Sequence, residues 1–315
     1  MCDEIRELGF DTIEASHGLS LSLMPGVIKA VEEKRIRVEG VHNFCPAPIE
    51  VSGDAPDAYQ FTSYRKEERD RALRLTRETL QVAARLEARY VVLHMGSVHT
   101  FLTKQATRTL QRMARHGYVG TPEYAALKNK LVRERYERSP LYYERVRETL
   151  HTLSEEAAKL NLVLGVEGRS HFEQMPGETE MYRLMEEFED DPHVMYWHDF
   201  GHIQRKHNLL LLNHEQYLRK LKPYIFGGHV NDVQWPQRDH RAPFMGGGVD
   251  FRTLVPRFFN REMPLTWELS SSVTREDILE AKPLWDEMME TVPSTVCRRC
   301  HLHDAVCELE ESEED

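Results

Sequence analysis

Residues 162–199, LVLGVEGRSHFEQMPGETEMYRLMEEFEDDPHVMYWHD, decide the fold. The segment contains two short apolar runs, LVLGVE at 162–167 and VMYWHD at 194–199, and each run ends in a carboxylate. Residues 178–188, between the two runs, indicate a helix. A buried strand, a helix and a second buried strand form a βαβ unit, in which the two strands are parallel. The segment therefore predicts an α/β fold built on a parallel sheet.

The same alternation continues on both sides of this segment. Apolar runs that end in polar residues indicate seven strands, at 12–14, 37–43, 90–94, 162–167, 194–199, 224–232 and 265–268. Helices are expected at 67–88, 178–188, 215–221, 251–259 and 278–291. The regular spacing suits a closed (β/α)8 TIM barrel better than an open sheet. Such a barrel needs eight strands. Residues 3–8 occupy the place of the helix that follows the first of those eight strands. We therefore expect the first strand to be missing or truncated at the N-terminus.

Composition indicates one soluble domain. The chain has 315 residues, 40% of them hydrophobic, and a net charge of −11. Without a linker, residues 1–292 are expected to form one barrel, followed by an acidic tail at 293–315 that contains cysteine and histidine. The acidic balance argues against a general nucleic-acid binder, and no apolar run approaches the length that spans a bilayer. The charged start lacks a signal-peptide core, so a cytoplasmic location is expected.

Every predicted strand ends in a carboxylate or an imidazole. The carboxyl ends of the strands of a (β/α)8 barrel surround the active site, and polar residues there indicate chemistry. Each residue alone also has a structural interpretation: a single histidine such as His94 is more often hydrogen-bonded than a ligand. Seven such endings in succession favour a metal site, because buried carboxylates repel one another unless a cation compensates. The residues are Glu14, His42, His94, Glu167, Asp199, His229 and Glu268.

Several of these strand ends resemble the xylose isomerase-like TIM barrel superfamily. That group includes sugar isomerases and epimerases, and the endonuclease IV type of abasic-site nuclease. The similarity runs from residue 1 to about 291, and the order and spacing of the motifs are more specific than any one of them. The segments are GFDTIE at 9–14, VLHMG at 92–96, LGVE at 164–167, HDFGH at 198–202, GHVND at 228–232 and TWE at 266–268.

The resemblance implies roles for individual residues. In the ketose 3-epimerase branch a Glu, an Asp, a His and a Glu from four strands hold the metal, which maps onto Glu167, Asp199, His229 and Glu268. Substrate contacts in this branch come from a Glu six residues after the first ligand, from a His three residues after the Asp, and from an Arg after the metal His. The corresponding candidates, together with the two histidines that end earlier strands, are Glu173, His202, Arg238 or Arg241, His42 and His94.

The abasic-site nuclease branch offers an alternative. There His42, His94 and His202 would join the four residues in a three-zinc site. The nuclease pattern also has Asp-Arg-His after the metal histidine, whereas this chain has Asp239-His240-Arg241. That departure, and the acidic composition, make nucleic acid the less favoured partner.

The four proposed ligands suit proton transfer on a sugar. Three carboxylates and one imidazole form a mostly hard oxygen site for one divalent ion, with Mn²⁺ preferred and Mg²⁺, Co²⁺ or Zn²⁺ as alternatives. The ion would chelate an α-hydroxy ketone and stabilise the enediolate left by proton removal. Glu167 and Glu268 fit an acid–base pair on opposite substrate faces, which gives a metal-dependent isomerase or epimerase. The open alternatives are two carboxylates that serve only as ligands, and a non-catalytic metal- or carbohydrate-binding barrel.

Two further regions carry weaker signals. Residues 100–160 are helical and highly charged, which indicates solvated helix faces, a lid, or a contact in a homo-oligomer. In the tail, Cys297, Cys300, His303 and Cys307 have ligand types and spacing that permit zinc, although a flexible tail with free thiols is the more common outcome. The C-x-x-C-H motif at 297–301 matches a haem attachment site only in an exported protein.

Overall fold

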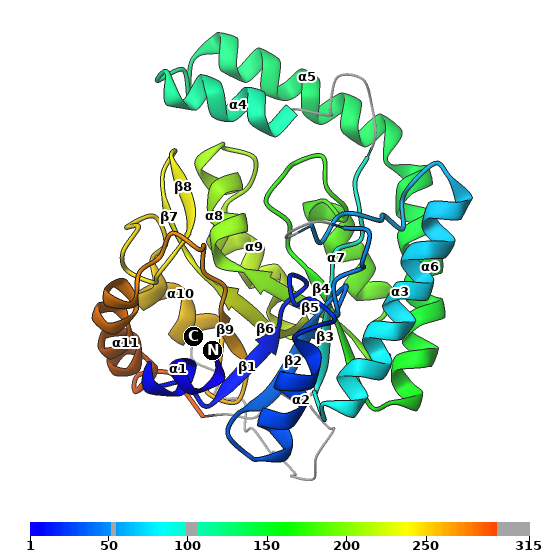
Figure 1. Cartoon of the computed structure of the whole chain (residues 1–315). Coiled ribbons are helices and arrows are strands. Elements are labelled where there is room, and N and C mark those ends of the chain that lie inside the picture. The colour runs from blue at the N-terminus through cyan, green and yellow to red at the C-terminus, as the bar shows by residue number, and fades with distance from the viewer. Residues whose placement is uncertain (52–54, 99–105, 295–315) are drawn as a thin grey trace, which may run out of the picture.

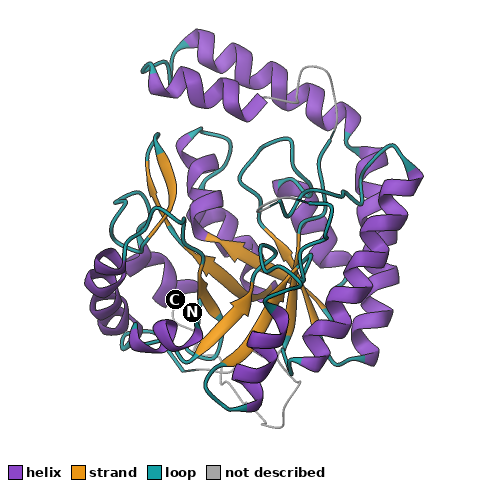
Figure 2. Ribbon diagram, viewed as in Figure 1, coloured by secondary structure: helices purple, strands orange, loops and turns teal. Residues whose placement is uncertain are grey.

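The computed structural model describes residues 1–51, 55–98 and 106–294. Seven parallel strands form one sheet in the order β1-β2-β3-β4-β5-β6-β9, with helices on its outer face (Figures 1 and 2). All seven predicted strands are confirmed. Their bounds are Thr12–Ala15 (β1), Arg37–His42 (β2), Tyr90–Leu93 (β3), Val163–Glu167 (β4), Val194–Asp199 (β5), Ile225–Val230 (β6) and Leu265–Trp267 (β9). A separate antiparallel hairpin contains β7 (Asp232–Gln234) and β8 (Arg238–Arg241).

The helices follow the predicted alternation. None of the described helices is long and apolar enough to cross a membrane. Residues 295–315, which include the tail cysteines and histidines, lie outside the described part of the chain. The helices are α1 (Cys2–Glu7), α2 (Met24–Glu32), α3 (Lys66–Arg85), α4 (Ala106–Arg115), α5 (Pro122–Arg138), α6 (Pro140–Lys159), α7 (Glu178–Glu187), α8 (Phe200–Asn208), α9 (His214–Leu221), a 3-10 turn (Lys222–Tyr224), α10 (Phe251–Phe258) and α11 (Arg275–Met289).

The barrel is open between β1 and β9, and we call this opening the seam. β1 pairs with β2 and β9 pairs with β6, and the sheet order among the described residues places these two strands at its two ends. Helix α1 precedes β1, as a helix following a first strand would. The sheet is thus a nearly closed barrel of seven strands, and the expectation of a missing first strand is confirmed.

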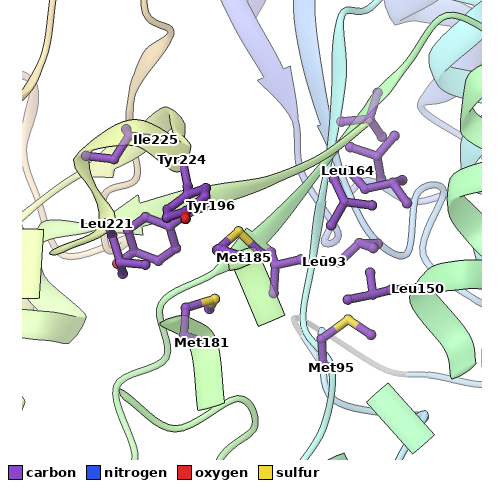
Figure 3. Packing of buried hydrophobic residues seen from close by; sticks show 14 of the residues in the cluster. Leu93, Met95, Leu150, Leu164, Met181, Met185, Tyr196, Leu221, Tyr224 and Ile225 are labelled. Carbon is purple, nitrogen blue, oxygen red and sulfur yellow. The ribbon is translucent and has the colours of Figure 1, made fainter. Parts of the chain in front are cut away.

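Two layers of apolar side chains explain why the central strands are apolar throughout. Inside the barrel, Tyr90, Trp197 and Phe226 belong to one buried cluster. Gly40 on β2 makes room for Tyr90, because a Cβ at Gly40 would lie 2.0 Å from that ring. Outside the barrel, Leu164 of β4 belongs to the large core cluster between sheet and helices, which Figure 3 shows. Strands buried on both faces are expected of parallel sheets.

Helices α4 and α5 form an additional layer beyond the barrel (Figure 1). Three buried contacts attach this layer. The Thr107 hydroxyl donates to Glu173 at 2.7 Å, and the Tyr124 hydroxyl donates to the Leu209 carbonyl at 2.8 Å. The fully buried Arg135 guanidinium makes a bidentate pair with Glu180 at 2.5 and 2.7 Å. Such planar, two-bond pairs fix geometry as well as charge, so the α4–α5 layer has a defined position over the barrel.

Candidate metal centre at the barrel rim

Four strand ends converge at one point of the rim. Glu167 and Asp199 are the last residues of β4 and β5, His229 lies near the end of β6, and Glu268 directly follows β9. One potential ligand atom from each of these residues lies within 4.8 Å of all the others. Strands β4, β5 and β6 are adjacent in the sheet, and their register pairs Asp199 with His229. This register accounts for the convergence.

Several of these atoms lack partners within the protein. Glu167 Oε1, His229 Nδ1 and Glu268 Oε2 are buried and make no hydrogen bond of good geometry, although His202 Nδ1 lies 2.9 Å from Glu167 Oε1. His229 Nδ1 lies 3.3 Å from Glu268 Oε2 and 3.7 Å from Asp199 Oδ2. Buried polar atoms are almost always satisfied, so a group of unsatisfied ones facing a common centre needs a cation or a proton. A divalent ion fits this donor set of three carboxylates and one imidazole.

Glu14 orients the histidine of the group. His229 Nε2 lies 3.0 Å from Glu14 Oε1, and a carboxylate oxygen can only accept, so Nε2–H donates to it. This bond leaves the Nδ1 lone pair of neutral His229 directed at the three carboxylates. A carboxylate that holds the second nitrogen of a ligating histidine is a recurrent feature of metal sites.

The pKa directions reflect crowding of like charges. Burial raises the pKa of the Asp199 carboxyl, and Glu268 and Glu167 add to this effect. Burial opposes protonation of His229, but Glu268 and Glu14 outweigh it and hold the pKa of His229 well above its usual value. The pKa values of Glu167 and Glu268 shift the other way: against burial, neighbouring imidazoles and, for Glu167, Arg169 hold them well below the usual range. In the absence of an ion, protons are therefore favoured on Asp199 and His229. An ion that binds here must displace them, so binding is expected to weaken at low pH.

A second group on the other side of Glu167 contains His42 and His94. With Glu167 these two histidines also place ligand atoms within 4.8 Å of one another. The Arg169 guanidinium, however, lies 3.3 Å from Glu167 Oε2, contacts His94 Nε2, and pairs with Asp57 at 3.0 Å. The chain thus supplies its own cation at this position.

His94 lies between the two carboxylates of this second group. Its Nδ1 lies 3.1 Å from Asp57 Oδ1, and its Nε2 lies 2.5 Å from Glu167 Oε2. Burial and Arg169 disfavour protonation of His94, but the two carboxylates outweigh them and raise its pKa. Each of its two ring nitrogens therefore has a carboxylate partner, beside the permanent charge of Arg169.

A third group joins Asp199 to His202 and His240. His240 Nε2 lies 3.4 Å from Glu268 Oε2, and His202 Nδ1 lies 2.9 Å from Glu167 Oε1. His17, from the loop after β1, forms a further group with His42 and Glu268. The structure therefore surrounds the four-residue centre with additional imidazoles.

Two predicted substrate contacts have other partners. The Glu173 carboxylate accepts from Thr107 at the start of α4, and Glu173 is in none of the four groups of potential ligands found in the described residues. An Arg241 nitrogen lies 3.8 Å from Asp277 at the start of α11. Glu173 thus attaches α4 to the barrel, and Arg241 lies beside the start of α11. Contact of either residue with a substrate stays a prediction.

Asp57 and Arg169 were missed by sequence reasoning. Asp57 lies in the long loop after β2, where no periodicity marks it. Arg169 follows Glu167 by two residues, and its position directly after a strand end was the available signal. The Arg169 side chain is buried, whereas the Asp57 side chain is 35% exposed. Burial would raise the pKa of the Asp57 carboxyl, but Arg169 and His94 outweigh it and hold that pKa far below its usual value.

A neutral chain of polar groups lies behind the centre. The Tyr196 hydroxyl donates to His198 Nδ1 at 2.9 Å, His198 Nε2–H then faces His214 Nε2 at 3.0 Å, and His214 Nδ1–H donates to Gln204 Oε1 at 2.8 Å. This order of donors satisfies each nitrogen with both histidines neutral. Burial, with a contribution from His207, lowers the pKa of His214 to about 3.

Comparison with known proteins identifies the family of this barrel. The profile of the xylose isomerase-like TIM barrel family matches residues 2–290, and the chain belongs to that family. No curated protein matches the sequence significantly.

Several solved structures with a similar fold are named as sugar epimerases or epimerase-like proteins. A D-tagatose 3-epimerase-like protein has a TM-score of 0.64 at 16% identity, with 92% of each chain covered. The 3-keto-D-glucoside 4-epimerase of E. coli, apo form, has a TM-score of 0.61 at 15% identity, with 91% of this chain and 92% of that chain covered. D-psicose 3-epimerase from Clostridium cellulolyticum H10, solved with D-tagatose, has a TM-score of 0.58 at 12% identity, with 93% of each covered. At these identities the likeness concerns the fold.

Proposed function

We propose that this protein is a divalent-metal-dependent isomerase or epimerase of a sugar or related polyol ketone. Glu167, Asp199, His229 and Glu268 would hold the ion, with Mn²⁺ preferred. The observation that carries the proposal is the convergence of four potential ligand atoms within 4.8 Å, three of the residues having buried atoms without a hydrogen-bond partner. The epimerase titles of similar structures support the substrate class.

Glu167 and Glu268 are the proposed acid–base pair. They come from β4 and from the residue after β9, which the sheet order places on different sides of the centre. The bound ion would polarise the substrate carbonyl and stabilise the negative charge that develops beside it. One carboxylate would take the proton from the adjacent carbon, and the other would return it from the opposite face. His202, which lies beside Glu167, would contact substrate oxygens.

The test is deuterium exchange during turnover. The Mn²⁺-loaded protein is incubated with a panel of ketoses in D₂O, and proton NMR follows the carbon next to the carbonyl. We expect one ketose to take up solvent deuterium and to yield an epimer or isomer. The matched control is Asp199→Ala, which should bind no ion and exchange nothing. Absence of exchange with every ketose, in protein shown to hold its ion, would contradict the proposal.

A three-metal phosphodiesterase is the second candidate. The observation in its favour is that His42, His94 and Glu167, and also Asp199, His202 and His240, form further groups of potential ligands next to the four-residue centre. Against it, Arg169 already places a cation between His94 and Glu167. Three zinc ions per chain, together with cleavage of an abasic DNA duplex that weakens steeply with salt, would favour this candidate.

A further inference from the structure

One side chain joins three loops at the rim. Asp57 lies in the loop that precedes α3, and its Oδ1 lies 3.1 Å from Nδ1 of His94, which directly follows β3. Its Oδ2 accepts from Arg169 at 3.0 Å and from Gln174 at 3.3 Å, both in the loop between β4 and α7. His94, Arg169 and Gln174 are each more than nine-tenths buried. An aspartate from one loop thus fills a buried set of donors on two other segments.

The loop that carries Asp57 is held in place by its own contacts. The Thr62 hydroxyl donates to the Ser97 carbonyl at 3.0 Å and accepts from the Ser97 N–H at 2.9 Å. A Cβ at Gly96 would lie 2.2 Å from that hydroxyl, so the absence of a side chain at Gly96 makes room for this contact. Phe61 of the same loop is 1% exposed. Asp57 therefore meets its donors from an anchored segment of backbone.

Arg169 divides its guanidinium between two carboxylates. Its Nη2 donates to Asp57, and its Nη1 donates to Glu167 Oε2 at 3.3 Å. Glu167 Oε2 also lies 2.5 Å from His94 Nε2. The other oxygen, Glu167 Oε1, belongs to the side of the four-residue centre, where it lies 3.9 Å from His229 Nδ1. The two oxygens of Glu167 therefore have separate surroundings.

A guanidinium without a second partner has another arrangement open to it. Arginine and a carboxylate readily form a planar pair with two parallel hydrogen bonds. Arg135 has this arrangement in the same protein, because two of its nitrogens donate to the two oxygens of Glu180, at 2.5 and 2.7 Å. If Asp57 did not hold Nη2, Arg169 could take both oxygens of Glu167 in the same way. Glu167 Oε1 would then be lost to a cation at the centre.

We propose that Asp57 is a positioning residue for Glu167: it holds Arg169 by one nitrogen, so that Arg169 reaches only Oε2 and Oε1 stays directed at the centre. Asp57 acts through Arg169 and touches none of the other three proposed ligands. It should therefore matter for ion binding only while the guanidinium is present. The inference rests on the ion of the proposed function, but not on the reaction with a sugar.

The test measures Co²⁺ affinity by competition with a fluorescent chelator. Asp57→Ala should weaken binding about 10-fold, because loss of a group that orients a metal ligand typically costs about 10–100-fold. Asp57→Asn keeps one acceptor oxygen and should fall between Asp57→Ala and wild type. The double variant Asp57→Ala, Arg169→Met should recover most of the affinity, because no guanidinium remains to take Glu167 Oε1. Asp70→Ala, which breaks a surface pair with Lys66, is the matched control.

A second readout separates positioning from a loss of stability. At saturating Co²⁺ the visible absorption spectrum reports the geometry of the ligands. The spectrum should change in Asp57→Ala and return toward wild type in the double variant, whereas thermal unfolding of the ion-free proteins reports stability alone.

The possible outcomes distinguish this inference from the proposed function. Equal affinity and equal spectra in wild type and Asp57→Ala would overturn the inference, and so would a loss that Arg169→Met does not recover. Wild type that binds Co²⁺ but exchanges no ketose proton would contradict only the proposed reaction. Wild type that binds no Co²⁺ would overturn both.

Discussion

The two sides of Glu167 differ in how their charge is balanced. On one side, Asp57 and Glu167 meet Arg169, a permanent cation of the chain, beside a His94 whose pKa is raised. On the other side, Asp199 and Glu268 face His229, and buried atoms of Glu268 and His229 have no hydrogen-bond partner. Both sides contain carboxylates and imidazoles at strand ends. Buried atoms without a hydrogen-bond partner, rather than polar groups as such, therefore mark the position for an ion.

The largest expected effect concerns the proposed acid–base pair. Glu167→Gln and Glu268→Gln each keep an oxygen ligand but remove the basic carboxylate. Loss of a general base typically costs about 10²–10⁴ in rate, so we expect each variant to keep its ion and lose turnover. Metal analysis and ketose turnover are measured on the same samples. Glu156→Gln, at the partner of Arg77 on the surface, is the control. Equal turnover in all four proteins would show that both carboxylates are ligands only.

Removal of the orienting carboxylate should weaken metal binding. Glu14→Ala leaves His229 Nε2 without its acceptor, and changes of this kind typically cost about 10–100-fold in metal affinity. Glu14→Gln retains an acceptor oxygen and is expected to fall between Ala and wild type. Competition with a fluorescent chelator measures the dissociation constants. The same metal affinity in wild type and Glu14→Ala would show that Glu14 does not orient His229 for metal binding.

Removal of the Arg169 guanidinium should make the two sides of Glu167 more alike. The double variant Arg169→Met, Asp57→Asn takes away one positive and one negative charge, so no buried charge is left alone. Without the guanidinium, His42, His94 and Glu167 are expected to accept a second ion, more weakly than the main centre. Calorimetric titration with Mn²⁺ or Zn²⁺ gives the stoichiometry. A single ion in the double variant would mean that Arg169 is not what keeps that side free of metal.

The smallest effect concerns the neutral chain behind the centre. The pKa of His214 is about 3 in the folded protein and about 6.5 in the unfolded chain. The stability that neutral His214 contributes is therefore complete above pH 6.5 and is lost as the pH falls toward 3. Between pH 7.0 and 5.5 wild type should lose about 1.3 kcal/mol more than His214→Gln. Urea unfolding at both pH values measures this difference, and identical losses would contradict it.

The convergence of the strand-end residues was predictable because its signal is local. Glu167, Asp199, His229 and Glu268 each end an apolar run, and the parallel sheet brings such ends together. The seam was predictable for the same reason, since strands can be counted along the chain.

What could not be predicted depends on distant segments. The bond from Glu14 to His229 exists because the barrel curves β1 toward β6. Asp57 reaches the site from a loop without periodicity, and Glu173 binds Thr107 because α4 happens to begin there. Spacing along the chain carries no information about these meetings, so the charge balance at the rim became visible only in three dimensions.

The number of ions bound per chain distinguishes a one-ion centre at these four residues from a three-ion site. Wild type and the variants Asp199→Ala and Asp239→Ala are loaded with Mn²⁺ or Zn²⁺, desalted and measured by elemental analysis. Asp239 pairs with Arg205 near the rim and lies outside the four-residue centre, so it is a matched control. The account predicts about one ion per chain in wild type and in Asp239→Ala, and almost none in Asp199→Ala. Three ions per chain in wild type, or one full ion retained by Asp199→Ala, would contradict it.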